Sequence, residues 1–352
     1  CMLFVMVFVM VVLPARPSRT ETIQNSMKLI EVHKIWDGGP HNAFTDLARF
    51  ENRWYCVFRE GEGHGSSDGA VRVISSADAA EWESEALIRM TPKRLRALEP
   101  KVLPDEEGYM DLRDPKLCIT PDGRLMLTAG LRYNADGEDM QSLAWFSEDG
   151  SIWGTPALIG ENQYWLWRVT WHVGVAYAVG RVPDERIPRL YRSTDGRHFE
   201  VLLKDAAFFP HVPGPSEATL RFRDDNTALC LIRLNNVPGS MTDHGHLGTA
   251  RPPYTNWTWQ DLGAKVGGPN MLELPDGRFV AAVRLYDNRQ RTALCWLDPK
   301  TGTLTEALTL PSGGDTSYAG LVSHDGVLWV SYYSSHEDKT SIYLAKVRID
   351  SE

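Results

Sequence analysis

Arginine recurs at one place in a repeated pattern of this sequence. Four arginines stand seven residues after a tight-turn residue, where an apolar alternating run ends: Arg59, Arg181, Arg233 and Arg284. Arg113 and Arg168 stand near the beginning of the run that leads into such a turn. A guanidinium group can bind a carboxylate through two parallel hydrogen bonds. If these side chains gather around one cavity, they predict a site for an anion, such as the carboxylate of a sugar.

Each of these arginines also has a plainer interpretation. It can cap the end of a strand and pair with a nearby aspartate or glutamate. That interpretation is sufficient for one arginine, whereas a ring of arginines around a cavity needs an anion to balance it. Both interpretations stay open at the level of the sequence.

A glutamate and a tyrosine occupy the place near the start of a run that Arg113 occupies elsewhere. They are Glu217 and Tyr318. A phenol has an ordinary pKa of about 10, so at neutral pH it is a weak nucleophile. A neighbouring base and nearby cations would favour its reactive form. Glu217 could be that base, and the arginines could be those cations.

Tight-turn residues flanked by apolar alternation recur about every 50 residues and define the elements that must position these side chains. They are Asn52, Gly123, Gly174, Asn226, Gly277 and Gly326. The first interval is longer, and residues 89–109 within it are interpreted as an insertion. A fixed period of this length is typical of repeat architectures.

Each turn joins two alternating runs, and a second pair of short runs follows, which makes four strands per unit. Six such units predict an all-β fold, a six-bladed β-propeller with four-stranded antiparallel blades, in a single domain over residues 27–352. The last unit lacks an outer strand, while residues 28–35 form a spare one. We expect the spare strand to pair beside residues 341–347 and close the ring, which removes open sheet edges.

The repeat also predicts where the chemistry lies. In a blade, the start of the innermost strand and the end of its hairpin partner lie at the same end of the central channel. Glu217, Tyr318 and the arginines are therefore expected at one mouth. Three further turns, at residues 76–82, 147–153 and 193–199, share the form S-x-D-x-x-x-aromatic. Their Ser and Asp can bind turn amides, so we interpret them as structural.

The sequence resembles the sialidase (neuraminidase) superfamily over residues 28–349. The resemblance rests on the six-unit period, on the S-x-D turns, which are similar to the family's Asp boxes, and on three segments. Residues 216–233 resemble the family's Glu strand with its following Arg, residues 317–322 its tyrosine segment, and residues 58–69 its acid/base loop. Two arginine positions of the family hold other residues here, in the segments 41–43 and 267–270.

The resemblance implies an exo-acting glycoside hydrolase that releases a terminal acidic sugar of the sialic-acid type with retention. In such enzymes a tyrosine replaces the usual carboxylate nucleophile. It implies Tyr318 as nucleophile, Glu217 as its base and Asp68 as acid/base. The predicted substrate-binding residues are Arg59, Arg113, Arg233 and Arg284. Two alternatives remain: a non-catalytic propeller that binds acidic glycans, and a hydrolase or lyase that acts on another uronate-like sugar.

The composition disfavours several other classes of protein. The formal net charge is −9 and no long run of Lys or Arg is present, so neither nucleic acid nor an anionic membrane is expected as a partner. No phosphate loop, dinucleotide fingerprint or metal-ligand spacing is present, so no cofactor and no metal are expected. Cys56, Cys118, Cys230 and Cys295 lie in apolar runs and are interpreted as buried free thiols.

An apolar run occupies residues 2–13 and is too short to span a bilayer as a helix. Two interpretations of residues 1–26 stay open. They are a truncated signal peptide, which predicts a secreted or periplasmic protein, or a false upstream extension. In the second case Met27 is the true start and the protein is cytoplasmic.

Overall fold

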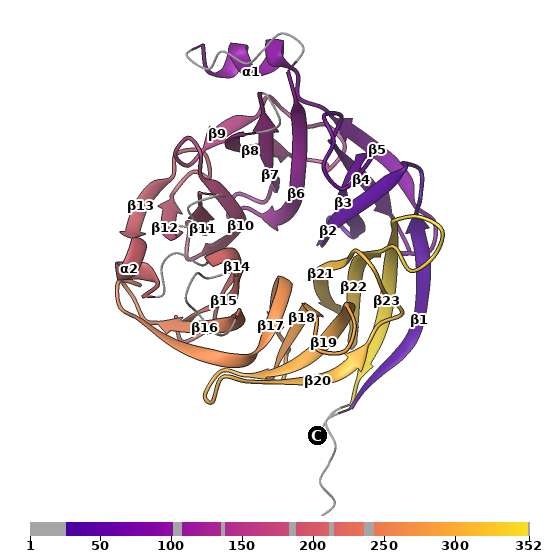
Figure 1. The fold of residues 1–352 in the computed structure, drawn as a ribbon, viewed down its shortest axis with the longest axis vertical. Helices are drawn as coiled ribbons and strands as arrows, with labels where there is room; N and C mark the ends of the chain where they lie inside the picture. The colour runs from indigo at the N-terminus through magenta and orange to yellow at the C-terminus, as the bar shows by residue number, and fades with distance from the viewer. Residues whose placement is uncertain are drawn as a thin grey trace, which may run out of the picture.

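The computed structural model describes residues 26–100, 108–134, 138–182, 188–210, 215–235 and 243–350. Strands dominate this part of the chain, and antiparallel sheets are arranged in a ring, as Figure 1 shows. The strands β2, β6, β10, β14, β17 and β21 lie nearest the centre of that ring. The all-β prediction is therefore confirmed. The apolar run at residues 2–13 lies outside the described residues.

Four of the sheets have four strands each. The first contains β2 (His41–Phe50), β3 (Arg53–Gly61), β4 (Ala70–Ser76) and β5 (Glu83–Ile88). The second contains β6 (Met110–Ile119), β7 (Leu125–Tyr133), β8 (Asp139–Ser147) and β9 (Ala157–Ile159). The third contains β10 (Trp165–His172), β11 (Val175–Arg181), β12 (Pro188–Ser193) and β13 (Glu200–Lys204). The fourth contains β21 (Thr316–His324), β22 (Val327–Ser334), β23 (Ser341–Ile349) and β1 (Met27–Trp36).

The remaining sheet has seven strands. They are β14 (Pro215–Phe222), β15 (Ala228–Leu234), β16 (His244–Ala250), β17 (Trp257–Glu273), β18 (Phe279–Leu285), β19 (Arg291–Asp298) and β20 (Thr303–Thr309). The long β17 joins two groups of strands, because its first part, residues 257–265, pairs with β16, and its second part, residues 266–273, pairs with β18.

The spare N-terminal strand pairs where we expected it. β1 runs antiparallel to β23, with Met27 opposite Ile349 and Lys34 opposite Tyr343. Figure 1 shows β1 on the outside of the ring, next to β23. This pairing covers the edge that β23 would otherwise expose.

The innermost strands share an irregularity in their pairing. In each of them the register shifts so that two residues of the inner strand lie opposite one residue of its partner, which is a β-bulge. The shifts fall at residues 43–46, 113–116, 166–169, 215–218, 267–270 and 317–320. Phe44, Asp114, Gly268 and Tyr318 lie in these bulges with φ of 63°, 51°, 55° and 51°. The bulge takes these residues out of the normal alternation of the strand.

The S-x-D turns fold as the sequence predicts. The carboxylate of Asp149 accepts a hydrogen bond from the hydroxyl of Ser147 at 3.1 Å and from the amides two and three residues further on, both at 2.8 Å. The carboxylates of Asp78 and Asp195 accept the equivalent bonds in their own turns. These hydrogen bonds lower the pKa of Asp149 to about 2, so its charge is part of the folded turn.

The insertion at residues 89–109 contains a short helix, α1 (Pro92–Leu98), which starts at the N-cap Thr91 and lies outside the ring (Figure 1). A second helix, α2 (Asp205–Phe208), follows β13. Among the described residues, no helix has the length and apolar character needed to cross a membrane. Four cysteines are free thiols, but Cys118 is only half-buried, which differs from the expectation that all four are buried.

Replacement of Asp149 by alanine should lower the free energy of unfolding by about 1–2 kcal/mol, because the turn loses a charged acceptor of three hydrogen bonds. Urea unfolding at pH 7 measures this loss. Glu148→Ala is the control, because Glu148 is exposed on the same turn and its loss should cost less than about 0.5 kcal/mol. Equal effects of the two substitutions would contradict the structural role of Asp149.

Candidate active site

Glu217 and Tyr318 meet at the centre of the ring. The Tyr318 hydroxyl donates a hydrogen bond to Glu217 Oε1 at 2.6 Å. Arg233 Nη1 lies 2.6 Å from the same carboxylate oxygen and 3.1 Å from the Tyr318 hydroxyl. The other oxygen, Oε2, accepts the backbone amide of Gly268 at 2.6 Å. A phenol, a carboxylate and a guanidinium thus form one hydrogen-bonded cluster, which brings together three of the residues predicted from the sequence.

Gly268 is required at this place for two reasons. Its φ of 55° is one that residues with a side chain rarely adopt. In addition, a Cβ atom on Gly268 would come within 2.7 Å of the Tyr318 ring. Glycine therefore lets the backbone of β17 approach both Tyr318 and Glu217.

The environment keeps Glu217 ionised. Burial by itself raises the pKa of this carboxyl, but the charge of Arg233 and the hydrogen bonds from Tyr318 and Gly268 outweigh it, so the pKa is lowered overall. Glu217 is 4% exposed, and charged hydrogen bonds are strong at such a buried position. An ionised carboxylate that already accepts the phenol's hydrogen bond is placed to take its proton.

The pKa of Tyr318 differs from the expectation that arginines would favour the phenolate. Burial and the negative charge of Glu217 raise the pKa of Tyr318 well above 10, and the charges of Arg233 and Arg284 offset only part of this. The side chain is 8% exposed, so desolvation of a phenolate is costly. Tyr318 therefore keeps its proton in the resting protein, and attack by its oxygen requires simultaneous transfer of the proton to Glu217.

Arg284 belongs to the same cluster but has its own protein partners. Its guanidinium carbon lies 5.3 Å from the centre of the Tyr318 ring. Its Nη2 donates to Asp315 Oδ1 at 3.0 Å and to the Tyr333 hydroxyl at 2.8 Å, and its Nε donates to the carbonyl of Thr316. Arg284 thus contacts the face of Tyr318 while it is held by an ion pair.

Arg59 does not point to open space, in contrast to its predicted role in substrate binding. Its side chain is 0% exposed, and its Nε donates to Asp111 Oδ1 at 2.6 Å. Its other nitrogens donate to the carbonyl of Gly63 and to Ser66. These bonds hold the segment between β3 and β4, as the plainer interpretation of the arginines predicts. Arg113 lies 3.6 Å from the other oxygen of Asp111.

Asp68 lies on that same segment, and its carboxylate is bound locally. It accepts hydrogen bonds from the amide of Glu62 at 3.2 Å. Burial raises its pKa, but hydrogen bonds from Ser66 and from this amide outweigh that effect, so the pKa is lowered. The hydrogen bonds described for its side chain come from its own segment, and none joins it to Glu217 or Tyr318 in the described part of the chain. Its predicted role as acid/base stays a prediction.

Asp114 is a site residue that the sequence analysis missed. It lies in the bulge of β6, at the place that Tyr318 occupies in β21, and is 4% exposed. Its Oδ1 is buried and has no hydrogen-bond partner among the described residues, and burial raises its pKa. The signal was present, because Asp114 precedes the turn at Gly123 by nine residues, as Glu217 precedes the turn at Asn226.

Phe44 forms an aromatic wall beside the cluster. Its ring lies 5.2 Å from the Tyr318 ring and 5.4 Å from the Tyr333 ring, between centroids. It also lies 5.1 Å from the ring of His64, between centroids. The ligand atoms of His41, His64 and Asp315 lie within 4.8 Å of one another, close enough to bind one metal ion.

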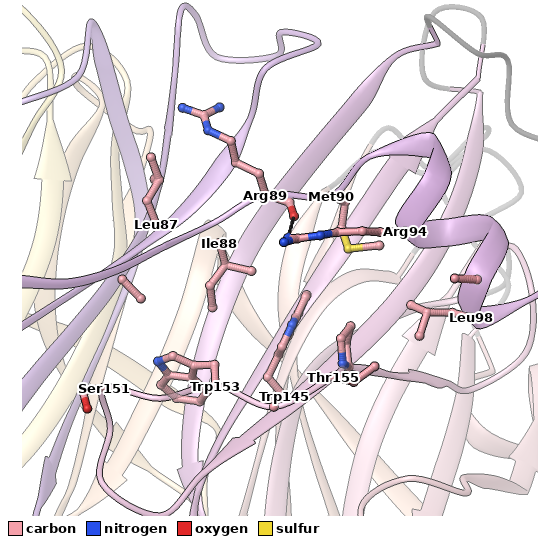
Figure 2. Close-up of a pocket in the computed structure, with 14 residues that line it drawn as sticks. Leu87, Ile88, Arg89, Met90, Arg94, Leu98, Trp145, Ser151, Trp153 and Thr155 are labelled. Carbon is pink, nitrogen blue, oxygen red and sulfur yellow. Dashed lines mark hydrogen bonds between the residues drawn. The ribbon is translucent and has the colours of Figure 1, made fainter.

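A separate cavity of about 450 Å³ lies between β5, α1 and the segment after β8. Figure 2 shows Trp145, Trp153 and Arg94 along it. None of the residues predicted for catalysis or substrate binding lines this cavity. The insertion therefore adds a recess to the outside of the ring, distinct from the Tyr318 cluster.

Comparison with known proteins supports the fold. No family model matches the sequence, and no curated protein matches it. A solved Dyadobacter fermentans protein of unknown function superposes with a TM-score of 0.75 at 17% identity, over 92% of this chain and 100% of that one. An α-L-arabinofuranosidase from Fusarium graminearum, in complex with an iminosugar inhibitor, superposes with a TM-score of 0.66 at 12% identity, over 91% and 98%.

A Trypanosoma rangeli sialidase in complex with the inhibitor DANA superposes with a TM-score of 0.62 at 10% identity, over 92% of this chain and 58% of that one. At such identities these similarities establish a shared fold and no more. Solved structures with this fold thus include glycoside hydrolases that act on different sugars.

Replacement of Arg233 by methionine should destabilise the protein by about 3 kcal/mol at pH 7, because it leaves the Glu217 carboxylate buried without its cation. In the wild type the pKa of Glu217 lies below its ordinary value of 4.5, so its contribution to stability is present above that pH and is lost as the pH falls further. In the variant this pKa should rise, so the deficit should shrink between pH 7 and pH 5.

Urea unfolding at both pH values measures the deficit. The double variant Arg233→Met/Glu217→Gln should recover much of the stability, because it removes the unpaired charge. A deficit that is the same at both pH values, with no recovery in the double variant, would show that Arg233 acts through packing instead.

Proposed function

We propose that this protein is an exo-acting glycoside hydrolase that uses Tyr318 as nucleophile and releases a terminal acidic sugar of the sialic-acid type with retention. The observation that carries the proposal is the 2.6 Å hydrogen bond from the Tyr318 hydroxyl to Glu217, with Arg233 on the same oxygen. A nucleophile within hydrogen-bond reach of its base, with the base held by further groups, is the arrangement that nucleophilic catalysis requires.

The chemistry proceeds in two displacements. The Tyr318 oxygen attacks the anomeric carbon, its proton passes to Glu217, and the bond to the leaving oxygen breaks as an acid protonates that oxygen. Water then attacks the same carbon and gives a proton to the conjugate base of that acid. The bond to Tyr318 breaks, and the phenol regains its proton from Glu217. Two inversions at one carbon give net retention.

A tyrosine nucleophile supports an acidic sugar as the substrate. A carboxylate on the anomeric carbon would repel a carboxylate nucleophile, whereas a neutral phenol avoids that repulsion. Arg113, Arg233 and Arg284 supply positive charge around the cluster. Each of these arginines also contacts a protein carboxylate, so a ligand carboxylate would share them. The alternatives are a non-catalytic propeller that binds acidic glycans and a hydrolase or lyase for another uronate-like sugar.

We also propose that the ring is a single domain of six blades over residues 27–352. Four sheets provide four blades, and the seven-stranded sheet provides two more if the two parts of β17 are counted separately. With β1 beside β23, the chain then closes the ring between its two ends.

Replacement of Tyr318 by phenylalanine should reduce turnover of an aryl sialoside by at least about 1,000-fold, because the nucleophilic oxygen is lost while the ring remains. Release of the aryl group is measured by absorbance, and far-UV circular dichroism checks the fold. Tyr332→Phe is the matched control, because Tyr332 is also buried and its hydroxyl donates to the carbonyl of Pro311. That control should keep near wild-type turnover.

A panel of aryl glycosides tests the sugar: a sialoside, a Kdn glycoside, a glucuronide and an α-L-arabinofuranoside. Turnover of the arabinofuranoside alone would contradict the acidic-sugar proposal while leaving the nucleophile in place. A Tyr318→Phe variant that remains active would rule out this tyrosine as nucleophile. A wild type that is inert on the whole panel but binds free sialic acid in calorimetry would favour the binding module.

A further inference from the structure

A histidine that the mechanism above does not use lies beside the Tyr318 cluster. His64 belongs to the segment between β3 and β4, and its Nδ1 lies 2.6 Å from Asp315 Oδ2. Its side chain is 57% exposed, while that of Asp315 is 25% exposed. An imidazole that uses one nitrogen on a half-buried carboxylate keeps its other nitrogen for a substrate or water.

Asp315 is fixed in position by other contacts. Its Oδ1 accepts the Tyr333 hydroxyl at 2.7 Å and Arg284 Nη2 at 3.0 Å, and its backbone amide donates to Ser335 Oγ at 2.8 Å. These contacts leave Oδ2 for two histidines, with His64 Nδ1 at 2.6 Å and His41 Nε2 at 3.5 Å, and the shorter contact orients His64. A carboxylate that orients the imidazole of a general acid or base in this way is a recurrent catalytic arrangement.

His64 and Tyr318 lie along the same aromatic wall. Both rings contact Phe44, with centroids at 5.1 Å for His64 and 5.2 Å for Tyr318. Arg284 links them a second time, because it contacts the Tyr318 ring and binds the carboxylate that holds His64. The Asp68 carboxylate, in contrast, is bound to the amide of Glu62 in its own segment.

We propose that His64, oriented by Asp315, is the acid/base catalyst of this hydrolase in place of Asp68. This inference rests on the proposed function. His64 is the catalytic residue, and Asp315 is a positioning residue that acts through it.

The proton transfers of this assignment balance. In the first displacement His64 Nε2 gives its proton to the glycosidic oxygen as that bond breaks, while Tyr318 bonds to the anomeric carbon and its proton passes to Glu217. In the second, neutral His64 takes a proton from the attacking water. The bond to Tyr318 breaks, and the phenol regains its proton from Glu217. His64 ends in its starting state.

His41, His64 and Asp315 could instead bind a metal ion together, but the distance between His64 and Asp315 favours a hydrogen bond. Two ligands at zinc bond lengths of about 2.0 Å in a tetrahedral site lie roughly 3.3 Å apart. His64 and Asp315 approach to 2.6 Å, which is shorter than that spacing and is the distance of a short hydrogen bond. The Asp315 carboxylate already binds Arg284, and the positive charge of that arginine disfavours a divalent cation nearby.

The test compares leaving groups. His64→Gln should lower turnover of an alkyl sialoside by about 100-fold or more, because an alkoxide needs a proton to depart. Turnover of a 2,4-dinitrophenyl sialoside, whose leaving group needs no proton, should keep its first step and accumulate the covalent intermediate. Sodium azide, which attacks without a base, should then restore turnover. Asp315→Asn should show the same pattern to a smaller degree, as expected of a positioning residue.

His198→Gln is the matched control, because His198 makes an equivalent 2.6 Å contact with Asp195 in one of the S-x-D turns. This control variant should turn over both substrates at the wild-type rate. Asp68→Asn is the competing variant: a leaving-group dependence and azide rescue there, and not in His64→Gln, would overturn the proposal.

Stoichiometric metal in the purified protein, measured by mass spectrometry and lost in His64→Gln, would overturn it as well. Failure of this inference is distinguishable from failure of the proposed function. If only this inference fails, Tyr318→Phe is inert, and His64→Gln changes the turnover of the alkyl and the dinitrophenyl sialoside equally. If the proposed function fails, Tyr318→Phe stays active, or the wild type is inert.

Discussion

The register shift in the innermost strands is the constraint on which the candidate site depends. Side chains of a regular strand alternate between its two faces, so a residue at the centre of the ring would normally face one neighbouring sheet or the other. The two-residue bulge removes Tyr318 from this alternation, at a φ of 51° that is unfavourable for a residue with a side chain. The strain is localised where the strands converge, and the contacts of Tyr318 with Glu217, Phe44 and Gly268 hold it there.

A second constraint comes from ion pairs between neighbouring sheets. Arg59 at the end of β3 binds Asp111 of β6, and Arg284 at the end of β18 binds Asp315 just before β21. Each aspartate precedes the bulge residue of its strand, Asp114 or Tyr318, by three positions. The two pairs are thus equivalent joints between sheets. Arg59 and Asp111 are both buried, and Arg284 is buried beside the half-buried Asp315. Because such pairs need both partners, these arginines balance protein charges before any ligand arrives.

These ion pairs between sheets help explain which parts of the fold and of the candidate site could be predicted from the sequence. Hairpins and S-x-D turns are local, so the tight-turn residues were predictable from spacing. The pairing of residues 28–35 with the last strand was predictable because the last unit lacks an outer strand. The meeting of Glu217 and Tyr318 was predictable from their similar places, nine and eight residues before a turn. The ion-pair partners of Arg59 and Arg284 were not predictable, because Asp111 and Asp315 come from the following sheet. The bulges were not predictable either, since they change which face a residue occupies without any change of composition. Asp114 shares the nine-residue offset of Glu217 before a turn, but the sequence does not show that it lies in a bulge.

Burial acts in opposite directions on the two halves of the proposed nucleophile. It raises the pKa of the Tyr318 phenol well above its usual value, and by itself it would raise that of Glu217 as well. Arg233, the Tyr318 hydroxyl and the amide of Gly268 reverse the effect on Glu217, whereas Arg233 and Arg284 offset only part of the effect on Tyr318. The result is a neutral acid beside an ionised base, with the proton held between them at a short distance. A proton transfer of this kind needs no free phenolate in the resting protein, so the same burial that makes Tyr318 a poor acid also protects it until a substrate carbon accepts its oxygen.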